Sequence, residues 1–298
     1  MTTGGSRRPV GYREVVLDRM PSLARLLATA LGRTRTLVLA RDVAGRDGLP
    51  EVVLRVDDVA PDAAGLADYQ HLLGEPGTDE LPAGYVHVLA FPLAMAVMTR
   101  ADFPLQVLGL VHLANRVEQL RPVHLEESLT VRAWAEQARE HHRGVQVDLV
   151  VEVTAGGDVV WRGTSTYLSR RRPPGLTAGP PAPRTEHPPP PPAPRALWRL
   201  GADTGRRYAD VSGDRNPIHV SRLGARLFGF RRPIAHGMYT AARALAATPH
   251  PGSFVWTAEF GKPVLLPTTV AFARHGERYT VWDPRSGKVH LSGAVHPL

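Results

Sequence analysis

Apolar residues alternate with polar residues along much of the first half of the chain, as they do in strands that bury one face of a sheet. The alternation is clearest at five positions that are two residues apart: Val145, Val147, Leu149, Val151 and Val153. Further runs of strand length lie at residues 34–40, 52–56, 107–120, 128–137 and 159–168. The sequence Gly156-Gly157-Asp158, just before the last of these runs, predicts a hairpin turn.

Each half also contains a stretch that is apolar on almost every side of a helix, which predicts a buried helix. In the first half this stretch is residues 88–98 (VLAFPLAMAVM). Pro92 suits it if the helix starts nearby, because a proline in the first turn costs no hydrogen bond. In the second half the stretch is residues 233–247 (PIAHGMYTAARALAA). Strands are predicted after it at residues 253–260, 268–274, 279–283 and 288–296.

The two halves form a weak internal repeat. In each half a basic-Pro-Val sequence lies between the helix and the strands that follow, Arg121-Pro122-Val123 in the first and Lys262-Pro263-Val264 in the second. The repeat predicts two copies of one α+β unit, each an antiparallel sheet wrapped around a long central helix, since such a sheet covers most faces of an apolar helix. Two such units side by side would form one continuous sheet.

A proline-rich segment separates the halves. Eleven of the 28 prolines lie between Pro173 and Pro194, including the run at 188–192, which excludes a regular helix or strand. Such a segment is extended and semi-rigid, as a linker between domains is. We therefore expect an N-terminal domain at residues 1–172, a linker at 173–194 and a C-terminal domain at 195–298.

Composition excludes several kinds of site. The chain has no cysteine, so thiolate nucleophiles, disulfides and cysteine-ligated zinc are excluded, and histidine and carboxyl side chains must carry any chemistry. No apolar run reaches the length of roughly 18 residues that spans a bilayer, and residues 1–13 lack an apolar signal core. We expect a cytoplasmic protein without a membrane partner.

The formal net charge of +8 raises the question of nucleic-acid binding. The basic residues are almost all arginine and are scattered as short groups, such as Arg206-Arg207 and Arg231-Arg232, without a stripe that alternates with aromatic residues. We therefore expect no nucleic-acid partner. A pair near a site could instead contact the phosphates of an acyl carrier.

The residues best suited to catalysis lie between Tyr208 and Met238. Asp214 and His219 are five positions apart, and Pro217 stiffens the loop between them and holds Asn216 extended. A carboxyl group and an imidazole that face one water molecule form a general acid/base pair. Each residue alone has a structural explanation, since Asp214 or Asn216 could cap a turn and His219 could be a packed side chain. Their combination favours catalysis.

His236-Gly237 begins the apolar helix of the second half. The N-terminus of a helix offers unpaired N–H donors and a partial positive charge, which would stabilise an oxyanion at the backbone of Gly237. A tight turn is the alternative explanation for Gly237. For His236 we favour the role of a hydrogen-bonded core residue.

The same region carries a family resemblance. Its pattern Y-A-x-x-S-G-D-x-N-P-I-H, followed by A-x-x-x-G-F and I-A-H-G-M, resembles the signature of MaoC-like, (R)-specific enoyl-CoA hydratases, which are hotdog-fold proteins. Residues 87–93 and 109–121 resemble the first half of double-hotdog (3R)-hydroxyacyl-thioester dehydratases. The resemblance implies an α+β double hotdog and a hydro-lyase of fatty-acid metabolism. Its substrates would be trans-2-enoyl or (3R)-hydroxyacyl thioesters.

The resemblance also implies roles for individual residues. Asp214 and His219 would activate the water, Asn216 would orient the site, and Gly237 would supply an oxyanion-hole amide. No cofactor or metal is implied. The D-x-N-P-x-H pattern is absent from the first half, so we expect that half to be a catalytically silent copy that shapes the tunnel for the acyl chain.

Two other functions stay open at this point, an acyl-thioesterase on the same fold and a non-catalytic acyl-thioester-binding protein. The substrate could be carried on CoA or on an acyl-carrier protein. Hotdog units usually pair, and a fused double unit already meets that need, so a monomer and a homodimer are both compatible with the sequence.

Overall fold

The computed structural model describes residues 8–33, 48–181 and 193–298. The strand predicted at 34–40 and the central part of the proline-rich segment, residues 182–192, lie outside these ranges. The chain divides into two compact units. Unit 1 comprises Met1–Pro61, Val86–Asn115 and Val123–Arg184, and unit 2 comprises Asp62–Tyr85, Arg116–Pro122 and Thr185–Leu298.

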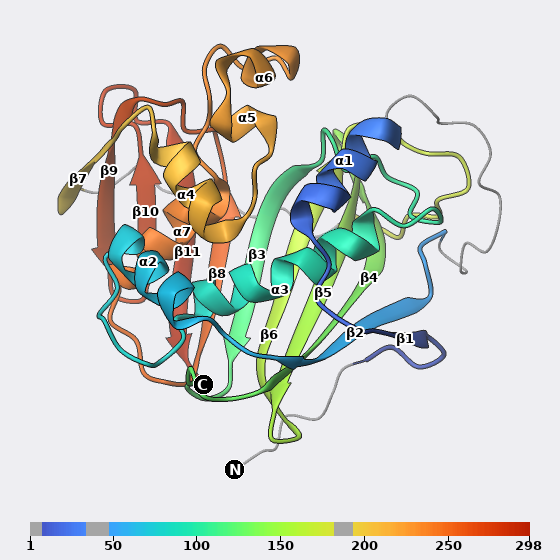
Figure 1. Ribbon diagram of the computed structural model, residues 1–298. Helices are drawn as coiled ribbons and strands as arrows, with labels where there is room; N and C mark the ends of the chain where they lie inside the picture. The colour runs from blue at the N-terminus through green and yellow to red at the C-terminus, as the bar shows by residue number, and fades with distance from the viewer. Residues whose placement is uncertain (1–7, 34–47, 182–192) are drawn as a thin grey trace. The chain divides into compact units, whose positions relative to one another are not determined.

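Unit 1 is built on a mainly antiparallel sheet (Figure 1). Its paired strands follow one another in the order β1 (Arg13–Leu17), β2 (Val52–Val59), β4 (Leu129–His141), β5 (Gly144–Ala155) and β6 (Asp158–Ser169). Only the β1–β2 pair among these is parallel. Gly156 and Gly157 connect β5 to β6 with φ angles of 60° and 92°, which confirms the predicted hairpin turn. The strand β3 (Val111–Gln119) is shorter than predicted and contains residues of both units.

Strand β5 is buried on both of its faces, whereas the alternation of apolar residues predicted one buried face. The polar residues on its second face are buried because they are paired. Glu152 is fully buried and lies 3.0 Å from the guanidinium of Arg162. Asp148 accepts hydrogen bonds from Arg139 and from the hydroxyl of Thr166. Such pairing offsets the cost of removing these groups from water.

The apolar stretch of the first half forms α3 (Ala83–Met98), in which every residue is buried or half-buried. The predicted buried helix is therefore confirmed. It starts five residues before the predicted position, so Pro92 lies in its interior and not in the first turn, where a proline would cost no hydrogen bond. Proline cannot donate to the carbonyl four residues earlier, and the apolar surroundings of α3 keep the helix intact despite this loss. The helix α1 (Leu23–Arg33) precedes β2.

Unit 2 contains an antiparallel sheet with the order β8-β11-β10-β9-β7. The strands are β7 (Ala196–Leu200), β8 (Phe254–Phe260), β9 (Thr268–His275), β10 (Arg278–Trp282) and β11 (Val289–Pro297). The four predicted strands of this half agree with β8 to β11. The helix α7 (Gly237–Ala246) packs against β8, β10 and β11.

Helix α7 begins four residues after the predicted start at 233. The preceding residues are extended because Ile234 forms a β-bridge with Leu265, and the backbone N–H of Ala235 donates to Val264. The remaining helices of unit 2 are α2 (Ala63–Leu73), α4 (Thr204–Ser212), α5 (Pro217–Val220) and α6 (Arg222–Leu227). Both α4 and α7 pack against α2. In the described part of the chain, no helix is long and apolar enough to cross a membrane.

Candidate active site

The segment that carries Asp214 and His219 is a tight succession of caps. Helix α4 ends at Gly213, whose φ of 73° is left-handed and whose N–H donates to Ala209. Asp214 follows directly. The side chain of Asn216 then caps α5 by accepting a hydrogen bond from the N–H of Ile218, and Pro217 occupies the first turn. The predicted stiff loop is therefore a helix end, a cap and a new helix start.

Two glycines, one before this segment in the sequence and one after it, let the neighbouring helices pack closely on it. A Cβ atom on Gly205 in α4 would lie 2.2 Å from the carbonyl oxygen of His219, and one on Gly224 in α6 would lie 2.5 Å from the Cβ of Pro217. Both distances are far below van der Waals contact. Helices α4 and α6 therefore pack directly on the backbone of α5, which fixes the position of His219.

The ring of His219 has one nitrogen engaged by the backbone. Its Nδ1 lies 2.8 Å from the carbonyl oxygen of Ile234, which can only accept, so Nδ1 carries the hydrogen. The other nitrogen, Nε2, is then unprotonated and can accept a proton. Burial, followed by repulsion from His236, lowers the pKa of His219 to about 3. The imidazole is consequently neutral near pH 7.

His236, the N-cap residue of α7, stacks on His219 with ring centroids 3.7 Å apart and an interplanar angle of 24°. Its Nε2 lies 2.9 Å from the backbone oxygen of Asp214 and donates to it. Burial lowers the pKa of His236 to about 4. The prediction that His236 is a hydrogen-bonded core residue agrees with this geometry, since the residue is only 3% exposed. The sequence did not indicate its contact with His219.

The carboxyl group of Asp214 completes the group that we call the Asp–His–His cluster (Asp214, His219 and His236). Its Oδ1 accepts from the N–H of Asn216, and its Oδ2 lies 3.7 Å from Nε2 of His236. One side-chain nitrogen or oxygen atom from each of the three residues lies within 4.8 Å of the others. The carboxyl and the imidazole therefore face the same small volume, as general acid/base chemistry requires.

The spacing of the Asp–His–His cluster would also suit a metal ion, but the orientation of its rings does not. A ligating imidazole binds a metal in the plane of the ring at roughly 2 Å. Two rings stacked face to face at 3.7 Å direct their in-plane lone pairs along separate lines. The arrangement is better suited to moving a proton.

Gly237 is the first residue of α7 and lies at the N-terminus of this helix, where the backbone N–H groups are not capped by a side chain. Its N-cap, His236, makes no side-chain hydrogen bond to the first turn, and no hydrogen bond to the Gly237 N–H is found within the described residues. A Cβ at this position would lie 2.9 Å from the ring of Phe260. Glycine at this position therefore lets the ring of Phe260 pack directly on the N-terminus of α7.

Comparison with known proteins places the chain in a family. A model of the "MaoC like domain" matches residues 182–292. A curated relative, 3-hydroxyacyl-thioester dehydratase X of Mycobacterium tuberculosis, is 38% identical over 258 residues, which are 85% of this chain and 91% of the relative. This chain belongs to the MaoC-like dehydratase family.

Solved structures of MaoC-like dehydratases show the same fold. The crystal structure of HtdX from Mycobacterium tuberculosis is similar with a TM-score of 0.73 and 35% identity, over 83% of this chain and all of that one. A MaoC-like dehydratase from Phytophthora capsici is similar with a TM-score of 0.67 and 19% identity, over 87% of this chain and 98% of that one. The predicted double hotdog of the α+β class is therefore confirmed.

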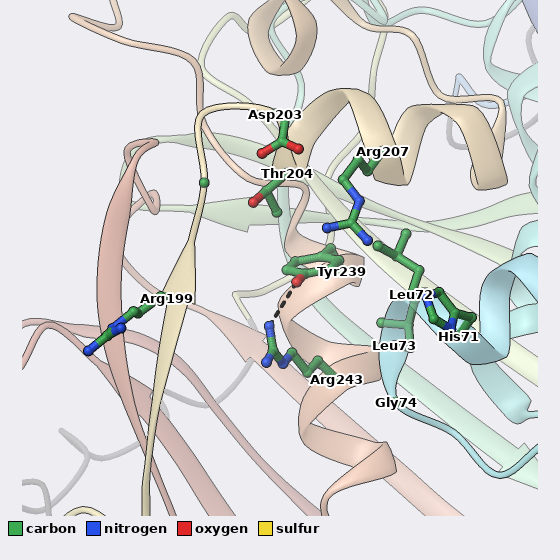
Figure 2. Close-up of a pocket in the computed structure, with 11 residues that line it drawn as sticks. His71, Leu72, Leu73, Gly74, Arg199, Asp203, Thr204, Arg207, Tyr239 and Arg243 are labelled. Carbon is green, nitrogen blue, oxygen red and sulfur yellow. Dashed lines mark hydrogen bonds between the residues drawn. The ribbon is translucent and has the colours of Figure 1, made fainter.

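A separate cavity of about 330 Å³ lies elsewhere in unit 2 of this MaoC-like chain (Figure 2). It is lined by the ends of α2, β7, α4 and α7, and includes Arg199, Arg207 and Arg243. No member of the Asp–His–His cluster lines it. In Figure 2 the guanidinium of Arg243 donates to the hydroxyl of Tyr239 at 2.9 Å.

Aromatic contacts connect this cavity to the Asp–His–His cluster. Tyr239 meets Tyr208 edge to face at 5.7 Å, and Tyr208 meets the ring of His236 at 4.9 Å. Burial raises the pKa of Tyr208 well above its ordinary value, so it remains a neutral phenol. The two tyrosines therefore support His236 from the side of α4 and α7. The sequence offered one signal for this role, since Tyr208 is the first residue of the matched family pattern.

Proposed function

We propose that this protein is a hydro-lyase that hydrates trans-2-enoyl thioesters and dehydrates (3R)-hydroxyacyl thioesters in fatty-acid metabolism. The observation that carries the proposal is the Asp–His–His cluster beside the open N-terminus of α7. A carboxyl and an unprotonated imidazole nitrogen face one small volume there. The family relationship supports the same reaction class, since the relative from Mycobacterium tuberculosis bears the name of a 3-hydroxyacyl-thioester dehydratase.

The two catalytic side chains would hold one water molecule between them. Nε2 of His219 and the carboxyl of Asp214 can both accept its hydrogens, which directs a lone pair of its oxygen at the β-carbon of the enoyl group. As the C–O bond forms, one of the two groups accepts the water proton, and this proton is then passed to the α-carbon of the enolate, which returns the group to its unprotonated state. Burial disfavours a protonated His219, so a proton taken up there would be passed on readily.

The thioester carbonyl would lie at the N-terminus of α7. Electrons that move from the C=C bond onto the carbonyl oxygen during attack create an enolate, and the Gly237 N–H and the helix dipole would stabilise its negative charge. One such donor contributes about 3 kcal/mol in enzymes where it has been removed. The carbonyl site and the water site would be only a few bonds apart, as conjugate addition requires.

The remaining residues have supporting roles in this proposal. Asn216 orients the site by capping α5, because its side-chain oxygen accepts from Ile218. The family relationship implies the (3R) product, whose configuration is set by the face of the β-carbon that the held water attacks. The domain at residues 1–172 would be a catalytically silent copy that shapes the acyl tunnel, joined by the linker at 173–194 to the catalytic domain at 195–298.

A thioesterase is the second candidate on this fold. It would direct the same water at the carbonyl carbon instead of the β-carbon, and it would release a free thiol. The position of the open α7 amide suits either reaction, but the family relationship favours hydration.

The test is an assay of the purified protein with trans-2-enoyl thioesters of graded chain length. Loss of enoyl absorbance without thiol release supports the proposal, and the product should be the (3R)-hydroxyacyl thioester. Thiol release at the rate of enoyl loss would show a thioesterase. Tight binding without either change would show a non-catalytic acyl-thioester-binding protein.

A further inference from the structure

Helix α6 exposes its large apolar side chains and buries its small ones. Leu223 and Leu227 are 68% and 77% exposed, and Phe228, which ends the helix, is 37% exposed. The two residues that face inward are Gly224 and Ala225. A surface helix normally does the reverse, because removing leucine side chains from water stabilises the fold. The apolar face of α6 therefore has the character of a contact surface.

Arginines lie near this apolar face in the sequence. Arg222, Arg226 and Arg231 are exposed and form no ion pair within the described residues. The chain has no aspartate or glutamate between Asp214 and Glu259. We call this surface the α6 patch, which consists of six residues: Arg222, Leu223, Arg226, Leu227, Phe228 and Arg231. A surface that complements it must be acidic and must also offer apolar side chains.

The α6 patch is attached rigidly to the catalytic segment. Gly224 packs on Pro217, the first residue of α5, and His219 follows two residues later. The side chain of Ser221 caps α6 directly after α5. Figure 1 shows α6 beside α5, at the outer edge of the elements that follow β7. A partner bound on α6 would therefore stand next to the site where the thioester reacts.

We propose that the α6 patch docks the protein that carries the acyl chain, an acidic carrier protein whose thioester sits on a flexible prosthetic arm. This proposal rests on the proposed function and names the form of its substrate. A nucleotide carrier has charged groups for the arginines, but it does not need two leucines and a phenylalanine on an open helix surface. An acidic protein surface with apolar side chains meets both demands at once. A membrane is less well matched, because a six-residue helix offers little apolar area for a bilayer.

The experiment compares one enoyl chain on three thiols: a purified acyl-carrier protein, CoA and pantetheine. The variants are Leu223→Ser with Leu227→Ser, and Arg222→Glu with Arg226→Glu. Each should lower kcat/KM for the carrier-protein substrate by about tenfold or more, mainly through KM, and should leave the pantetheine substrate unchanged. Matched controls are Leu197→Ser, whose leucine is 61% exposed on β7, and Arg285→Glu, whose side chain is exposed. The controls should behave like the wild type.

Three outcomes would overturn the docking proposal. An equal loss on CoA and on the carrier protein would mean that the arginines bind phosphates of a nucleotide. Unchanged kinetics in both double variants would mean that the patch has no role in substrate delivery. If the wild type floats with vesicles of phosphatidylglycerol and phosphatidylcholine, and the double variants lose this flotation but keep their activity on the carrier-protein substrate, the patch binds a lipid surface.

Direct binding of the enoyl-carrier protein separates this proposal from the proposed function. If the wild type turns over none of the three thioesters, the proposed function fails. The docking proposal then still requires that the carrier protein binds the wild type and that the two double variants bind at least about tenfold more weakly. Binding that is equal in all proteins would reject docking whatever the activity.

Discussion

Each unit contains two histidines that burial keeps neutral, and in unit 2 a carboxyl group converges with them. In unit 1, burial lowers the pKa of His87 to about 4 and that of His112 to about 3. Burial has the same effect on His219 and His236 in unit 2. In the described part of the chain, the Asp–His–His cluster is the one group of three acidic or histidine side chains with converging ligand atoms.

The surroundings of the two pairs differ as well. His87 faces the ring of Phe91 at 6.0 Å, and His112 stacks on Tyr167 at 4.6 Å. His87 lies in the second turn of α3, whereas His236 directly precedes the first turn of α7. The pair in unit 2 thus has both a proton acceptor and a helix N-terminus. A neutral imidazole alone is therefore not enough for this chemistry, which also requires a carboxyl group and an oxyanion site beside the ring.

The largest expected effect comes from removing the group that distinguishes the two pairs. Asp214→Asn and His219→Ala should each reduce kcat for enoyl-thioester hydration by at least about a hundredfold, because the site loses one of its two groups that can exchange a proton with the water. The matched variant His87→Gln should retain activity within about threefold. Steady-state kinetics with circular dichroism as the folding control provide the measurement. Near-normal turnover by Asp214→Asn would show that the carboxyl group of Asp214 is not what makes the histidine pair of unit 2 catalytic.

A smaller loss is expected from closing the helix end. Gly237→Ala places a methyl group 2.9 Å from the ring of Phe260, so the start of α7 must shift, and kcat should fall by about tenfold. Phe260→Leu in the same chain should restore part of the activity by making room. If the double variant is as slow as the single one, the clash with Phe260 is not the cause.

His236 is expected to act by positioning its neighbours. His236→Phe removes the donor to the backbone of Asp214, and kcat should fall several-fold, whereas His236→Gln can keep that donor and should be faster. Repulsion from His236 contributes to the low pKa of His219. The acid limb of the pH–rate profile should therefore move to higher pH in both variants. A purely structural role would lower activity without moving that limb.

The smallest effect concerns stability and should be common to both units. The four histidines His87, His112, His219 and His236 have pKa values below the ordinary value of 6.5, because burial disfavours their charged forms. The unfolded chain therefore binds more protons than the folded chain between about pH 4 and 6.5, and the free energy of unfolding should decrease as the pH falls through this window. His87→Phe and His236→Phe should each flatten this dependence in urea titrations. The exposed control His71→Gln should not. An unchanged slope in both buried variants would show that these histidines do not cause the pH dependence.

The sequence predicted what local patterns encode. Most of the strands, the buried helix α3 and the dense run from Tyr208 to Met238 follow from periodicity or from a contiguous motif, whereas the short strands β1 and β7 were not predicted. The late start of α7 was not predicted, because Ile234 is held extended by a bridge to Leu265 far along the chain. The interior position of Pro92 and the second buried face of β5 likewise depend on tertiary packing.

The candidate site was predicted in part for the same reason. Asp214 and His219 are close in sequence, so one motif indicates both. The stacking of His236 on His219 and the fixing of α5 by Gly205 and Gly224 join residues from different elements. No local pattern specifies such contacts. The exposure of Leu223 on α6 is also invisible in the sequence, where a leucine at helical spacing indicates a buried face.

The central claim is that Asp214 and His219 act on one water molecule at the β-carbon of an enoyl thioester. It is tested most directly by hydration of a trans-2-enoyl-pantetheine in water enriched in the heavy oxygen isotope, with mass spectrometry of the product. The expected result is label in the 3-hydroxyl of an intact (3R)-hydroxyacyl thioester, formed by the wild type and suppressed equally in Asp214→Asn and His219→Ala. Label in the carboxyl group of a free acid, or labelling of the 3-hydroxyl that survives either substitution, would contradict the claim.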